Sequence, residues 1–132
     1  MLRFPLFLLI SLLLPVGLLY AEATSSELND ARAAVRRNLQ TPEGTLYDAD
    51  ISEEFPEQYR RSLQQCTENT PEKELANFEV FMNVGGDGAV RRALVSPETQ
   101  VALCLRQEVL KGSFSAPPKP GYWVRIELRL KD

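Results

Sequence analysis

The chain has 132 residues and a formal net charge of −3, and it contains two cysteines and no histidine. A mildly acidic chain argues against nucleic acid and anionic membranes as partners, because both require a basic face. The missing histidine removes the commonest general base of hydrolases that use Ser or Cys, and two cysteines alone make a poor zinc site. We therefore expect no catalytic residue, no metal ion and no cofactor.

The first 21 residues have the pattern of a secretion signal. Arg3 precedes an apolar run over residues 4–20, and small residues follow, with an A-x-A cleavage site at 21–23. The run is slightly shorter than the about 20 residues that span a bilayer, and an uncleaved membrane anchor is the alternative. We predict a signal peptide over 1–21, export to the periplasm, and no stable membrane anchoring after cleavage.

Two amphipathic helices are expected next, separated by a loop. Residues 25–40 place four apolar side chains on one helical face: Leu28, Ala31, Val35 and Leu39. Residues 41–50 contain Pro42 and Gly44 and are expected to form a loop. Ser52 can cap a second helix, which places four further side chains on one face: Phe55, Tyr59, Leu63 and Cys66. Thr70 and Pro71 predict a short helical turn that ends by Leu75.

The hydrophobic period changes from helix to strand at residue 77. Phe78, Val80, Met82 and Val84 alternate with Glu79, Phe81 and Asn83, which predicts a strand with one buried face, and 89–95 continue as a second strand. The stretch VGGDGAV at 84–90 lies between them. A phosphate loop would lead into a helix, and a calcium loop would need several acids, whereas Asp87 is alone. We therefore predict a β-hairpin, whose tight turn favours glycine.

A third helix and a final strand complete the expected elements. Ser96 is expected as the helix cap with Pro97 in the first turn, and Gly112 as a left-handed stop. Residues 114–121 are extended and rich in proline. Residues 122–130 alternate clearly and predict a strand. The candidate binding surface lies on that strand, unless a helix covers the tryptophan, and its residues are Tyr122, Trp123, Arg125 and Arg129.

Cys66 and Cys104 are expected to form a disulfide, because an exported chain with an even number of cysteines is typically bridged. The bridge would close a loop of about 38 residues, and the chain-entropy model assigns such a loop about 4 kcal/mol of stabilisation. It would join the second and third helices.

Residues 59–132 resemble the carboxy-terminal domain of TonB-type energy transducers, and more closely the disulfide-bearing AgmX/PglI type. The resemblance rests on Cys66, the turn and strand DGAVRRALV, the helix start at Ser96, Cys104, Phe114, the Pro117-Pro118 pair and the terminal strand. It implies an α+β domain in a Gram-negative periplasm, in which helices pack on one face of a small antiparallel sheet of about three strands. The chain lacks the long Pro- and Lys-rich segment of a transducer, so the resemblance does not imply energy coupling.

Together these features divide the chain into three parts. They are a signal peptide (1–21), an amphipathic helix and loop (22–45) and a TonB-C-like α+β domain (46–132). The expected function is a non-enzymatic, periplasmic protein-interaction module with an envelope protein as its partner. The alternative is a small secreted inhibitor or regulator of an envelope enzyme, whose wedge would be the proline-rich loop at 115–121.

Overall fold

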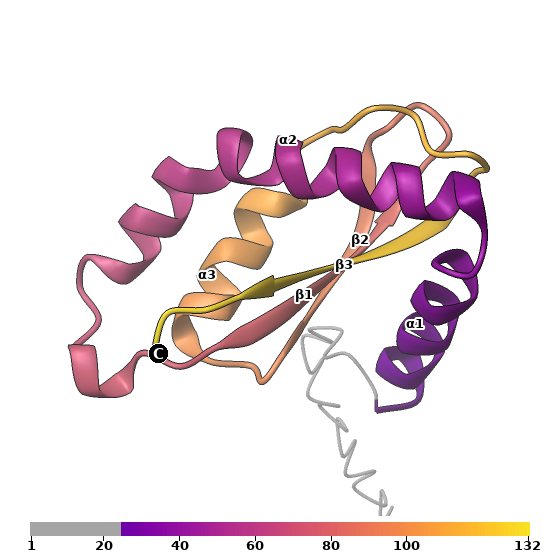
Figure 1. Ribbon diagram of the computed structural model, residues 1–132. Coiled ribbons are helices and arrows are strands. Elements are labelled where there is room, and N and C mark those ends of the chain that lie inside the picture. Colours follow the sequence, from indigo (N-terminus) through magenta and orange to yellow (C-terminus); the bar gives the residue numbers. More distant parts are fainter. Residues whose placement is uncertain (1–24) are drawn as a thin grey trace, which may run out of the picture.

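The computed structural model describes residues 25–132, which form three α-helices, a 3₁₀ turn and a three-stranded antiparallel sheet (Figure 1). The helices are α1 (Ser25–Asn38), α2 (Pro42–Thr67) and α3 (Gln100–Val109), and η1 (Glu72–Glu74) is the 3₁₀ turn. The strands β1 (Phe78–Val84), β2 (Val90–Ser96) and β3 (Tyr122–Leu128) have the order β2-β1-β3. The predicted fold class is confirmed. The predicted signal peptide lies outside the described residues.

The glycine-rich stretch closes the predicted hairpin between β1 and β2. Gly88 has a φ of +87°, a conformation that glycine adopts at the least cost. The Ala89 amide donates to Asp87 Oδ1 at 3.0 Å, and the Gly88 amide donates to the Gly85 carbonyl at 2.8 Å. A strand and not a helix follows the turn, so the hairpin prediction is confirmed.

One face of the sheet is covered by α2 and α3 and holds the main core (Figure 1). The β1 side chains that point to this face are buried: Phe78, Val80, Met82 and Val84. They belong to the same apolar cluster as stripes from both helices: Ile51, Phe55 and Tyr59 in α2, and Val101, Leu105 and Val109 in α3. Burying one such large apolar side chain contributes about 1.5–3 kcal/mol, so this cluster holds the two helices on the sheet.

The opposite face of the sheet is covered by α1. Ala31 and Val35 belong to one buried cluster with Phe81 of β1 and Leu94 of β2. At the start of α1, the Glu27 carboxylate accepts a hydrogen bond from Arg92 Nη2 at 2.7 Å. The hydrogen bond from Arg92 lowers the pKa of Glu27. The amphipathic helix predicted at 25–40 is thus confirmed over Ser25–Asn38, and Ala31 and Val35 of its apolar stripe cover the second face, whereas Leu39 follows the helix and is 41% exposed.

The loop predicted at 41–50 is wrong, because α2 begins at Pro42 and continues to Thr67. Thr41 caps the helix, and its hydroxyl accepts a hydrogen bond from the Gly44 amide at 3.1 Å. Proline in the first turn of a helix loses no hydrogen bond, so Pro42 starts this helix. Gly44 allows close approach: a Cβ there would lie 1.7 Å from the Asn38 carbonyl oxygen.

The predicted ends of the third helix are also corrected. Ser96 still pairs with Glu79 in the sheet, and the cap is Thr99, whose hydroxyl accepts from the Ala102 amide at 3.1 Å. Gly112 is not left-handed; a Cβ there would lie 1.7 Å from Tyr59 Oη. In the described part of the chain, no helix combines the length and apolar character needed to cross a membrane.

Candidate functional site: an apolar groove beside a free strand edge

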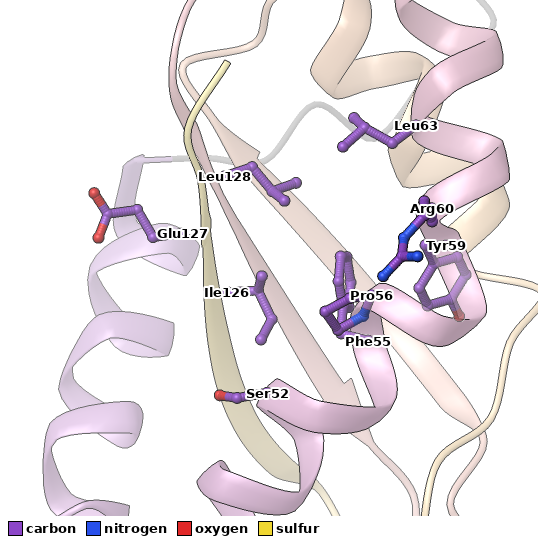
Figure 2. Close-up of a pocket in the computed structure, with 9 residues that line it drawn as sticks. All are labelled: Ser52, Phe55, Pro56, Tyr59, Arg60, Leu63, Ile126, Glu127 and Leu128. Atoms are coloured by element: carbon purple, nitrogen blue, oxygen red, sulfur yellow. The ribbon is translucent and has the colours of Figure 1, made fainter. Parts of the chain in front are cut away.

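A groove of about 370 Å³ runs between α2 and β3 (Figure 2). On the α2 side, helical spacing places Phe55, Tyr59 and Leu63 on one face of the helix, with the Tyr59 hydroxyl directed to α3. On the β3 side, strand alternation turns Ile126 and Leu128 toward the helix, while Glu127 points away (Figure 2). The remaining lining residues are Ser52, Pro56, Arg60 and Glu127. The groove is therefore mainly apolar.

The groove lies along the free edge of β3. β3 pairs with β1 on one side only, since the strand order is β2-β1-β3. At the start of β3, the Asn38 side-chain amide donates to the Trp123 carbonyl at 3.1 Å. From Val124 to Leu128, the backbone groups that face away from β1 have no hydrogen-bond partner within residues 25–132. Such an edge can template another strand.

The other edge of the sheet is partly covered. Ala89, just before β2, forms a bridge with Ser113, and the Val90 amide donates to the Gly112 carbonyl at 3.2 Å. Helix α3 also packs on β2. The chain after α3 thus runs along the beginning of β2 only, and from Arg91 to Ser96 the outward backbone groups of β2 also have no hydrogen-bond partner among residues 25–132. The edge of β3 differs in having the apolar groove beside it.

The disulfide between Cys66 and Cys104 is confirmed, with a distance of 5.8 Å between the two Cα atoms. It joins the last turn of α2 to the middle of α3, as the sequence predicts. Cys66 packs against the main core, and Leu63 one turn earlier lines the groove. The bridge therefore fixes the end of α2 that forms one wall of the groove.

The four residues of the predicted binding surface lie on two different faces. Tyr122 is 4% exposed and its ring contacts Tyr47 edge-on in the main core, with ring centroids 5.3 Å apart. Trp123 is half-buried and packs against the α1 cluster, so the alternative of a covering helix is the one observed. Arg125 Nη1 donates to Glu79 at 2.9 Å, and Arg129 is mostly exposed beside Glu127.

Trp123 and Tyr122 nevertheless contribute to a second hollow, of about 610 Å³, between α1 and the proline-rich loop. Its charged residues include both signs and leave no net charge: Asp30, Arg37, Glu43 and Lys119. The four charged residues are exposed, whereas Tyr122 is buried and Trp123 is half-buried.

The described acids and phenols nearest the core have structural surroundings that account for their protonation or their contacts. Burial raises the pKa of Asp48, and the nearby charge of Arg125 acts in the opposite direction. Glu54 binds the Ser115 amide at 3.0 Å and thus has a structural contact. Burial raises the pKa values of Tyr47 and Tyr59 to about 12, so both phenols are protonated at neutral pH. Among the described residues, no three His, Cys, Asp or Glu side chains are grouped to hold a metal ion.

Sequence reasoning named none of the apolar groove residues as a site. Phe55, Tyr59 and Leu63 are predicted as part of a helical stripe, and Ile126 and Leu128 lie in the alternating run 122–130 that predicts a strand. The signal for the groove in the sequence is the length of the alternating run at 122–130, because it continues to place apolar residues on one face as far as Leu128 and Leu130. How much of that face α2 covers depends on how the helix crosses the strand, which the sequence pattern does not give.

The comparisons with known proteins add no relative. No model of a protein family matches the chain, and neither a curated protein nor a solved structure is significantly similar to it. The groove and the free edge of β3 therefore have to be interpreted from their own chemistry.

Proposed function

We propose that this protein is a non-enzymatic interaction module of the bacterial envelope, exported through its first 21 residues. Its partner is another envelope protein, which supplies an extended segment that pairs with the free edge of β3. The resemblance of residues 59–132 to TonB-type carboxy-terminal domains supports a binding role. The Cys66–Cys104 disulfide supports an oxidising compartment.

The observation that carries this proposal is the combination of unpaired backbone and an apolar groove along one strand. An added strand gains main-chain hydrogen bonds from the edge, and its alternate side chains reach a pocket on one face. Here the pocket is the groove lined by Ile126 and Leu128 of β3 and by Leu63 of α2. The edge thus supplies affinity and the groove supplies a preference for an apolar side chain.

The proposal is tested by photo-crosslinking in intact cells with a crosslinking amino acid at Ser52, which lines the groove. A defined envelope protein should be captured at this position, and Leu128→Lys should abolish the capture by placing a charge in the groove. Leu46→Lys is the matched control, since Leu46 is 69% exposed elsewhere on α2. Equal capture by both variants, each with its disulfide formed, would contradict the proposal.

A second candidate, an enzyme inhibitor, is favoured by the way the proline-rich loop is held. Phe114 at its base is 7% exposed, and the Tyr47 hydroxyl donates to the Ser115 carbonyl at 2.9 Å. The loop is anchored while Pro118 and Pro120 are exposed. Replacing residues 116–120 with glycine and serine should abolish inhibition of an envelope enzyme and leave crosslinking at Ser52 intact.

A further inference from the structure

A third hollow, of about 250 Å³, lies on the opposite face of the sheet from the groove, between α1 and the strands. Three arginines surround it: Arg32 and Arg36 from α1 and Arg125 from β3. Its apolar lining is Val35, Leu39 and Phe81. Residues 32, 35, 36 and 39 fall on one side of a helix, so the hollow continues the stripe by which α1 packs on the sheet.

The hollow has more positive than negative charge. Glu79 is shared by two of the arginines: Arg32 Nη2 lies 3.4 Å from one carboxylate oxygen and Arg125 Nη1 lies 2.9 Å from the other. Arg36 has no acidic partner among residues 25–132. Asp48 lies within the field of Arg125 from the α2 side. The hollow therefore has three guanidinium groups and one directly bonded carboxylate, which contacts two of them.

Two of the three guanidinium groups, those of Arg32 and Arg125, are held in position beside an apolar floor, and Arg36 is exposed. The Arg32 guanidinium lies over the Phe81 ring, 5.5 Å from its centroid, and Phe81 itself is fully buried. Leu39 follows the end of α1 and is 41% exposed at the rim. Arginine forks recognise carboxylates through paired hydrogen bonds. A matching ligand carries a carboxylate next to an apolar group.

We propose that this hollow, formed by Arg32, Arg36, Arg125, Leu39 and Phe81, is a docking site for an acidic segment of a partner protein. The segment places a Glu or Asp carboxylate between Arg36 and Arg125 and a neighbouring apolar side chain against Leu39. The hollow is smaller than the about 300–1,000 Å³ of typical small-molecule sites, which fits one or two side chains. Nucleic acid would require an extended basic stripe, and this chain has a net charge of −3.

The test is an NMR titration of the chain, purified as the cell processes it, with N-acetyl-Leu-Glu-amide as the probe. Saturable shifts are expected at the Nε–H groups of Arg36 and Arg125 and at the Leu39 methyl groups. The isosteric N-acetyl-Leu-Gln-amide should bind about tenfold more weakly, because it lacks the charge-assisted hydrogen bonds. The groove along β3 should show no shifts, which separates this site from the proposed strand-binding function.

Matched variants distinguish the site from general electrostatic attraction. Arg36→Gln should weaken binding of the Leu-Glu probe about tenfold. Arg37→Gln removes the same charge from the next helix position, outside the hollow, and should leave the affinity for this probe unchanged. Equal weakening by both variants, or equal affinity for the Leu-Gln probe, would overturn the proposal. Inorganic phosphate that shifts the same groups at equal or lower concentration would also overturn it, because the site would then be selective for small anions.

Discussion

Gly44 is required by the close approach of two helices and a tyrosine. A Cβ at this position would lie 1.7 Å from the Asn38 carbonyl oxygen and 2.6 Å from Tyr122 Oη. Glycine to alanine inside a helix is normally stabilising by up to about 1 kcal/mol. We expect Gly44→Ala to have the opposite sign and to lower the free energy of unfolding by about 1–3 kcal/mol.

Urea denaturation measures this change, and Gly86→Ala is the control. A Cβ at Gly86 would meet only the Pro120 ring, at 3.3 Å or more, so its effect should be much smaller. A Gly44→Ala protein that is more stable than the wild type would show that α1 and α2 do not meet as described.

Tyr59 links the stability of the core to alkaline pH. Burial, with a smaller contribution from the charge of Glu108, raises the pKa of Tyr59 to about 12, above the about 10 of an unfolded tyrosine. The stabilisation from keeping this phenol protonated is fully present below about pH 10. This stabilisation is lost as the pH rises toward the pKa of Tyr59 in the folded protein, about 12. The free energy of unfolding should therefore fall between about pH 10 and about pH 12.

Tyr59→Phe should make this fall shallower, and denaturation midpoints measured at pH 8 and pH 11 give the comparison. Tyr47, with a pKa also raised to about 12, leaves a residual slope. At neutral pH the free energy of unfolding of Tyr59→Phe should be about 1 kcal/mol lower than that of the wild type. The variant lacks the hydroxyl that donates to the Val109 carbonyl at 3.3 Å in the wild type. An unchanged alkaline slope would mean that Tyr59 is not buried in solution.

At the scale of the elements, the start of α2 depends on one side chain. The Thr41 hydroxyl accepts the Gly44 amide at the amino end of the helix, where backbone amides otherwise lack partners. We expect Thr41→Ala to lower the free energy of unfolding by about 1 kcal/mol. Thr41→Ser keeps the accepting oxygen, so its free energy of unfolding should stay within a few tenths of a kcal/mol of the wild-type value. Equal destabilisation by both variants would assign the loss to the threonine methyl group instead.

Local patterns predicted which elements exist better than where they begin. Thr41-Pro42 is the same cap-and-proline signal that was used at Ser96-Pro97, yet the first starts a helix and the second does not. Gly44 argued for a loop because glycine weakens helices, whereas its role is to admit the Asn38 carbonyl. A contact with a distant element overrides local propensity, and that contact is not written in the neighbouring residues.

At the scale of the whole molecule, alternation separates the two faces of β1 and β3 but does not say what covers them, and in β2 a bulge places Val90 and Leu94 on opposite faces. Tyr122 and Trp123 are both predicted on the candidate binding surface, whereas the structure places Tyr122 in the main core and Trp123 beside α1 on the other face. The groove and the arginine hollow need the crossing of α2 over β3 and of α1 over the other face. Both depend on packing between segments far apart in the chain, which periodicity does not report.

The disulfide determines how much of this arrangement survives as a unit. It joins α2 to α3 across a separation of 38 residues, and the chain-entropy model assigns a loop of that length about 4 kcal/mol. We expect Cys66→Ala/Cys104→Ala to lower the free energy of unfolding by about 2–5 kcal/mol while far-ultraviolet circular dichroism at low temperature still shows the α+β fold. The main core on the sheet remains in the variant, so the groove should keep its apolar walls.

The reductant dependence of unfolding isolates the contribution of the bridge. Adding dithiothreitol should lower the denaturation midpoint of the wild type to that of the double variant, and it should leave the variant unchanged. A wild type that is insensitive to complete reduction would mean that the α2–α3 interface is stable without the bridge. In that case Leu63 and the wall of the groove would be positioned by packing on Leu128 and the main core alone.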